Sequence, residues 1–158
     1  MIVVLKFGGT CVESAQRRDQ ACQRVRDTLE EGYQVVLVVS AMGRKGEPYA
    51  TDTLISLARD IRDEVSAREM DLLVSCGEIV SAVTMVQELG KRGIDAIALT
   101  GGQAGIITDE TYGDAKITSV LPDSILRNLN EGKVVVVAGF QGIAPSGDIT
   151  TLGRGGSD

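Results

Sequence analysis

Four short apolar runs constrain the fold of this chain more than any other feature of its sequence. They are residues 1–5, 35–39, 96–99 and 134–137. Such runs, rich in valine, isoleucine and leucine and without polar alternation, are typical of strands buried on both faces of a parallel sheet. We therefore expect four core strands joined by crossover connections.

Helical periodicity fills most of the segments between these runs. Apolar residues recur at helical spacing over residues 13–31, 51–61, 70–74, 77–89 and 122–131. In this interpretation Gly77 and Glu78 open a helical run separate from the one before it. Residues 106–108 and 116–120 flank a polar turn and predict a hairpin at the sheet margin. Alternating strands and helices predict an α/β fold with helices on both faces of a mostly parallel sheet.

Glycine and hydroxyl residues follow all four apolar runs. Gly8 and Gly9 follow the first, and residues 40–43, 100–105 and 139–142 follow the others. Because the carboxyl ends of parallel strands meet at one edge, we expect these loops to converge on one crevice. Lys6 adds positive charge there, so the sequence predicts a phosphate site. The alternative is a surface lysine beside an ordinary turn, since the segment is neither a P-loop nor a dinucleotide fingerprint.

Composition narrows the class of ligand and of chemistry. The net charge is −6, aromatic residues make up 3% and tryptophan is absent, which argues against nucleic acid and against anionic membranes as partners. With no signal peptide and no uninterrupted apolar span, a cytoplasmic location is expected. The chain has no histidine, which excludes Ser-His-Asp and Cys-His nucleophile systems and imidazole metal ligands. Three cysteines without close pairing predict neither a disulfide framework nor a metal site.

An ordered set of motifs covers the whole chain. It comprises residues 6–10 (KFGGT), 39–43 (VSAMG), 51–54 (TDTL), 67–71 (AREMD), 77–78 (GE), 139–142 (GFQG) and 150–158 (TTLGRGGSD). Together and in this order, these motifs resemble those of aspartokinase, and the last motif is the most specific of them.

The resemblance implies the amino-acid-kinase fold, a three-layer α/β/α sandwich similar to that of carbamate kinase. It also implies transfer of the γ-phosphoryl group of ATP to the β-carboxylate of L-aspartate with Mg²⁺, giving 4-phospho-L-aspartate. That step opens the biosynthesis of lysine, threonine and methionine. A carboxylate nucleophile is already ionised at neutral pH, so no general base is needed, and catalysis rests on positioning and charge stabilisation.

The resemblance also implies roles for individual residues. Lys6 would neutralise the moving phosphoryl group and Asp158 would orient Lys6. The phosphates would lie against Lys6, Phe7, Gly8, Gly9 and Thr10. Contacts to aspartate would come from Ser40, Thr51, Glu78, Lys116, Ile117, Arg154, Gly155, Gly156 and Ser157, with Glu78 facing the ammonium group and Arg154 a carboxylate.

Simpler interpretations exist for three of these residues. Thr51 could be a helix N-cap, and Glu78 could be a first-turn acid that faces the helix dipole. Arg154, near the end of the sequence, could be a solvated surface residue. The motif set favours the functional interpretation for Lys6, Glu78 and Arg154 and leaves Thr51 and Ser40 open.

Aspartokinases continue well past the last motif, into a nucleotide-binding segment and, in many members, ACT regulatory domains. Residues 1–158 are therefore expected to form a partial domain, the aspartate-binding half, that is inactive alone. An unpaired sheet edge would favour a homo-oligomer. Two alternatives are another carboxylate kinase of the same fold and a non-catalytic module that binds an amino acid or assembles with a partner chain.

Overall fold

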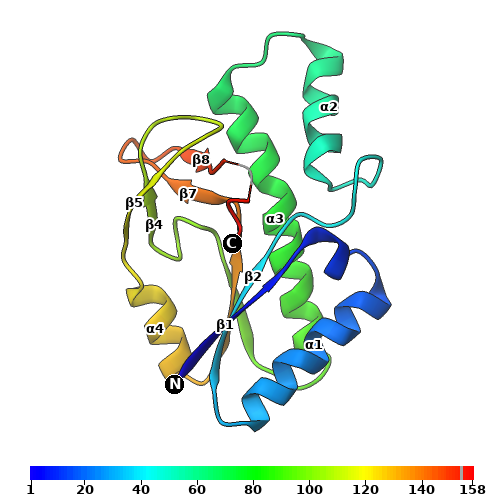
Figure 1. Cartoon of the computed structure of the whole chain (residues 1–158), viewed down its shortest axis with the longest axis vertical. Coiled ribbons are helices and arrows are strands. Elements are labelled where there is room, and N and C mark those ends of the chain that lie inside the picture. The colour runs from blue at the N-terminus through cyan, green and yellow to red at the C-terminus, as the bar shows by residue number, and fades with distance from the viewer. Residues whose placement is uncertain (154) are drawn as a thin grey trace.

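The computed structural model describes residues 1–153 and 155–158 and is organised around a four-stranded parallel sheet (Figure 1). The strands are β1 (Ile2–Phe7), β2 (Gln34–Val39), β3 (Ala96–Leu99) and β6 (Val134–Ala138), in the order β1-β2-β6-β3. All three strand pairs are parallel. The four core strands predicted from the apolar runs are therefore confirmed, and β6, buried throughout, lies between β2 and β3.

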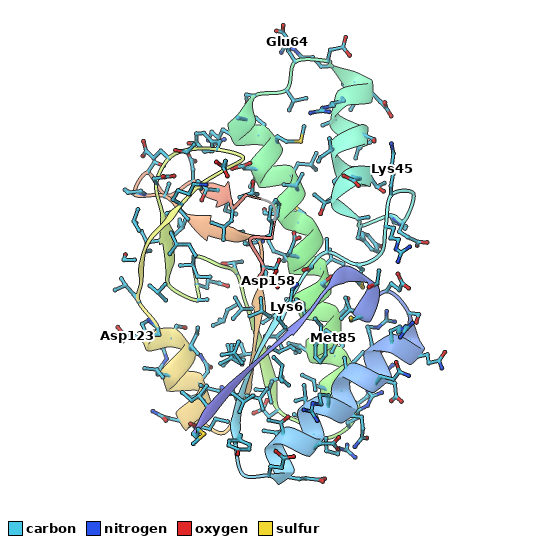
Figure 2. All side chains as sticks on the ribbon, viewed as in Figure 1. Lys6, Lys45, Glu64, Met85, Asp123 and Asp158 are labelled. Carbon is cyan, nitrogen blue, oxygen red and sulfur yellow. The ribbon has the colours of Figure 1, made fainter. Side chains whose placement is uncertain are left out.

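Helices cover both faces of this sheet, which confirms the α/β/α architecture. On one face, α1 (Ala15–Glu30) and α3 (Ala67–Gly90) enclose a core that includes the fully buried Met85 (Figure 2). On the other face, α4 (Asp123–Asn130) packs through Leu129 against a second core. The remaining helix, α2 (Thr51–Ile61), has no buried residue and packs against α3.

The long helix α3 corrects the expectation of two separate helical runs. It is continuous from Ala67 to Gly90, with Ser66 as N-cap accepting a hydrogen bond from the Glu69 N–H at 3.3 Å. Gly77 and Glu78 therefore lie in its middle. By length and composition alone α3 could cross a membrane, with a mean hydropathy of 1.4 over its best window, although half of that window is buried inside the fold. No uninterrupted apolar run marks α3 in the sequence, because charged and polar residues interrupt it.

A second, smaller sheet lies beyond the carboxyl ends of the main strands (Figure 1). It has the order β5-β4-β7-β8 and consists of β4 (Ile106–Thr108), β5 (Ile117–Val120), β7 (Gln141–Ile143) and β8 (Ile149–Thr151). The predicted β4–β5 hairpin is confirmed as antiparallel, but its expected place at the margin of the main sheet is wrong, because it belongs to this second sheet. The β7–β8 hairpin was not predicted, because glycines and a polar turn mask strands of three residues. Because β7 pairs with β4, the β7–β8 and β4–β5 hairpins together form one four-stranded sheet.

Strand β1 forms one edge of the main sheet, since it pairs with β2 and with no other named strand of the described residues. Its side chains alternate in burial, and Val4 is 63% exposed. This agrees with the expected open edge. Self-association through this edge remains a prediction.

Candidate functional site

The loops that follow β1, β2 and β6 meet at one edge of the main sheet. A Cβ on Gly9 would lie 2.2 Å from the Ala41 carbonyl oxygen, so only glycine lets the first loop come this close to the second. The Gly43 N–H donates to the Gly9 carbonyl at 3.3 Å, and the Gly139 N–H donates to the Val39 carbonyl at 2.9 Å. These contacts confirm that three of the four loops converge.

The loop after β3 packs against the second sheet. A Cβ on Gly101 would lie 2.0 Å from the Gln141 carbonyl oxygen, which places this loop directly on β7. The Ile106 N–H donates to the Gly101 carbonyl at 2.9 Å and leads the chain into β4. The fourth loop therefore joins the two sheets together.

Lys6 and Asp158 are brought together at the end of β1. Their Nζ and Oδ1 atoms lie 2.5 Å apart, and Figure 2 shows the two residues side by side near the middle of the molecule. The side chains are 38% and 69% exposed, so water screens the ion pair and its contribution to stability is small. The pair instead fixes the direction of the lysine, and both groups stay open to a ligand.

Consecutive turns place Asp158 on Lys6. The Gly156 N–H donates to the Gly153 carbonyl and the Asp158 N–H to the Gly155 carbonyl, each at 2.9 Å. Gly155 has a φ of 82°, a conformation that glycine adopts without strain. A Cβ on Gly139 would lie 2.7 Å from the Ser157 hydroxyl, so this loop rests on the end of β6. Arg154 lies outside the described residues.

The segment after Lys6 offers backbone N–H groups to an anion. Gly9–Cys11 forms the short 3-10 helix η1, and α1 begins only after Ser14, its N-cap, so the helix does not directly follow the glycines as expected. Among the turn and loop hydrogen bonds of the described residues, none is donated by the N–H groups of Gly8, Gly9 or Thr10 to a backbone carbonyl. The Phe7 side chain packs into the core, so only its backbone can face a phosphate.

Glu78 is buried beneath the loop that follows β2. Its side chain lies on the sheet-facing side of α3, the residue is 2% exposed, and Oε1 accepts a hydrogen bond from the Ala41 N–H at 3.2 Å. Burial raises the pKa of the Glu78 carboxyl to about 7, and the backbone hydrogen bonds oppose that shift only in part. The interpretation of Glu78 as a first-turn acid is therefore wrong. Its carboxyl group is held in place and can change charge near neutral pH.

Gly77 permits α3 to approach the loop that follows β2. A Cβ at this position would lie 2.8 Å from both the Ala41 Cβ and the Tyr49 carbonyl oxygen. We expect Gly77→Ala to lower the free energy of unfolding by about 1–3 kcal/mol, because the backbone must move to make room. Urea denaturation measures this. Gly90→Ala on the same helix has nothing within 4 Å and is expected to be neutral or stabilising; equal losses at both positions would contradict the argument.

The structure also locates four other residues that were predicted to contact aspartate. Thr51 is the first residue of α2, whose N-cap is Ala50 without a side-chain hydrogen bond, so the N-cap interpretation of Thr51 is wrong. Ser40 directly follows β2, and its N–H donates to the Phe7 carbonyl at 3.1 Å. Ile117 is the first residue of β5 in the second sheet, and Lys116 directly precedes it. Lys116 pairs with Asp114 at 2.9 Å, and Ile117 is 50% exposed on the edge strand β5.

Asp71 was assigned no role from the sequence, although it belongs to one of the motifs. It is 2% exposed and joins α3 to two other segments. Its Oδ2 accepts hydrogen bonds from the Gly113 N–H at 3.0 Å and the Thr151 N–H at 2.8 Å, and its Oδ1 accepts one from the Thr151 hydroxyl at 2.7 Å. Only its position on the buried side of a helix could have indicated this role. Asp71 anchors β8, the strand that leads into residues 152–158.

The described residues form no group of three or more acidic or cysteine side chains that could hold a metal ion. Asp158 is the carboxylate beside Lys6, and it is already paired. These side chains alone therefore do not fit a Mg²⁺ site.

The geometry defines a class of protein: a parallel α/β fold with a lysine, free N–H groups and a buried glutamate at the carboxyl ends of its strands. This edge is where such folds bind anionic ligands. The sequence pattern of the Amino acid kinase family matches residues 1–158. The chain belongs to this family.

Individual relatives agree with the family assignment. Aspartokinase 1 of Bacillus subtilis is 49% identical over 157 residues, which is 99% of this chain and 39% of that protein. The aspartate kinase structure from Synechocystis superposes with a TM-score of 0.79 at 43% identity, covering 99% of this chain and 24% of that one. E. coli aspartokinase III, solved with aspartate and ADP, has a TM-score of 0.77 at 24% identity, with 99% and 44% covered. The chain thus spans less than half the length of each of these relatives.

Proposed function

We propose that the chain contributes the aspartate-binding site of an aspartokinase, which transfers the γ-phosphoryl group of ATP to the β-carboxylate of L-aspartate. One observation carries the proposal: Lys6, and the loop held by Glu78, meet at the carboxyl ends of the parallel strands. Similarity to aspartokinases over nearly the whole chain supports the choice of substrate.

In this proposal each group acts by charge and position. Lys6, oriented by Asp158, neutralises the negative charge that moves during transfer. The N–H groups of Gly8 and Gly9 bind the phosphates. Glu78 in its ionised form pairs with the ammonium group of the substrate, and its raised pKa makes this pairing sensitive to pH. No general base is needed because the β-carboxylate is already ionised. Mg²⁺ would be bound mainly by the phosphates of ATP.

The proposal predicts that the 158-residue chain binds L-aspartate through both the ammonium group and the carboxylate groups of this substrate. Calorimetric titration with L-aspartate at pH 8 should show binding, and succinate, which lacks the ammonium group, should bind at least about tenfold more weakly because it leaves Glu78 unpaired. L-Glutamate is the control for chain length. Preference for glutamate would favour another carboxylate kinase instead.

ATP separates the proposal from its non-catalytic alternative. Aspartate binding without ATP binding supports the aspartate-binding half of a kinase. Binding of neither ligand by the chain, and of both when a second chain is added, would favour an assembly module and contradict the proposal as stated. Turnover by the 158-residue chain alone would contradict the expectation that it is inactive.

A further inference from the structure

Two polar atoms on the same side of α3 are buried without a hydrogen-bond partner. They are Oε2 of Glu78 and the hydroxyl oxygen of Ser81, and they are the buried side-chain atoms of this kind among the described residues. An unpaired buried polar group is costly, so each such group calls for a physical explanation. Residues three apart on a helix are neighbours on one face, with Cβ atoms about 5–6 Å apart. The two atoms are thus within reach of each other through side-chain rotation.

The Ser81 hydroxyl differs from the other hydroxyls buried in helices of this chain. The Ser75 hydroxyl, also on α3, donates to the Leu72 carbonyl at 2.8 Å, and the Thr28 hydroxyl donates to the Arg24 carbonyl at 2.8 Å. This backbone contact is the usual solution for a helical hydroxyl. Ser81 is fully buried and does not make it. Its hydroxyl therefore remains available for a side chain.

We propose that Ser81 is a positioning residue for Glu78, with its hydroxyl serving as the second hydrogen-bond partner of the Glu78 carboxyl group beside the Ala41 N–H. A hydroxyl both donates and accepts, so it can serve both charge states of a carboxyl group. It accepts from the protonated acid and donates to the carboxylate. The bond to the carboxylate is the stronger one because it is charge-assisted. Ser81 therefore favours the ionised Glu78 that an ammonium group requires.

Other charged groups do not account for the titration of Glu78. Its pKa is set by burial and by backbone hydrogen bonds, without a contribution from any charged side chain of the described residues. The charged groups on the surrounding elements have partners of their own: Lys6 with Asp158, Arg18 with Glu88, and Asp71 with Thr151. The hydroxyl of Ser81 is thus the neighbouring group with which the carboxyl can still bond.

The test is Ser81→Ala in the 158-residue chain, with the titration of the Glu78 side-chain carboxyl followed by ¹³C NMR. Loss of the donor should raise the Glu78 midpoint by about 0.5–1 pH unit. Ser75→Ala is the matched control: the same change, on the same helix and equally buried, should leave the midpoint unchanged. Ser81→Thr keeps the hydroxyl and should restore the wild-type midpoint.

Stability gives an independent readout. If the Ser81 hydroxyl truly had no partner, its removal would stabilise the fold and leave the Glu78 titration unchanged, and this result would overturn the proposal. A further consequence rests on the proposed function: Ser81→Ala should move the pH midpoint of aspartate binding upward by the same amount. If the wild-type chain binds no aspartate, the proposed function fails, whereas the NMR titration still decides the role of Ser81.

Discussion

Glu78→Gln is expected to remove a large part of the pH dependence of stability. The folded-state pKa of about 7 lies above the ordinary 4.5, so the folded protein holds this proton more tightly than the unfolded chain. The stability associated with the protonated acid is complete below about pH 4.5 and is lost as pH rises through 7. Between pH 5 and pH 8 the wild type should therefore lose about 2–3 kcal/mol more than the glutamine variant.

Urea denaturation at a series of pH values measures this difference. Glu88→Gln provides the control on the same helix, because hydrogen bonds from Arg92 and Arg18 lower the pKa of Glu88 against the effect of burial. Glu88 is therefore ionised in both states across pH 5–8, and its replacement should leave the slope unchanged. Parallel pH profiles for wild type and Glu78→Gln would show that the buried carboxyl does not titrate as described. Under the proposed function, Glu78→Gln, whose stability falls less between pH 5 and pH 8, should also bind aspartate more weakly than the wild type.

Asp71→Ala is expected to lower the free energy of unfolding by about 3–5 kcal/mol. The substitution leaves the N–H group and the hydroxyl of Thr151 buried without their acceptor, and it also removes the acceptor of the more exposed Gly113 N–H group. Denaturant titration gives the global loss. Amide hydrogen exchange gives its location, because protection should fall first at Gly113 and Thr151.

Two further variants serve as comparisons for Asp71→Ala. Asp71→Asn can turn its oxygen to both N–H groups while its amide group donates to the Thr151 hydroxyl, so its loss should be a fraction of that of alanine. Asp60→Ala, at an exposed position of α2, should change stability by no more than about 0.5 kcal/mol. A loss at Asp71 no larger than at Asp60 would show that β8 is held by other contacts.

The sequence was sufficient to predict the main sheet because its signals are local and strong. Four apolar runs became four parallel strands, and the glycines after them became close contacts such as that of Gly9 with Ala41. The ordered motifs correctly indicated the family. Lys6 and Asp158 were expected to act together, and the structure places them in contact.

Other features depend on tertiary contacts that no local pattern reports. The short strands β7 and β8 owe their pairing to each other and to β4, not to their own propensity. The continuity of α3 through Gly77 was missed because glycine is usually a helix breaker, whereas here it makes room for a neighbouring loop. The hydrogen-bond partners of Asp71, and the lack of a backbone contact at the Ser81 hydroxyl, become visible only when the segments are assembled.

The position of β6 between β2 and β3 has a consequence for how this chain acquires its structure. Val36 of β2 pairs with Val135 of β6, and most of the sequence lies between them. During synthesis the first βαβ segments leave the ribosome with the inner edge of β2 unpaired, until residues 134–138 arrive to fill the gap. Such non-local pairing is slow, and until it forms the unpaired edge of β2 can pair with strands of other chains. Strand β6, which completes this sheet, is thus the last of its four strands to be made.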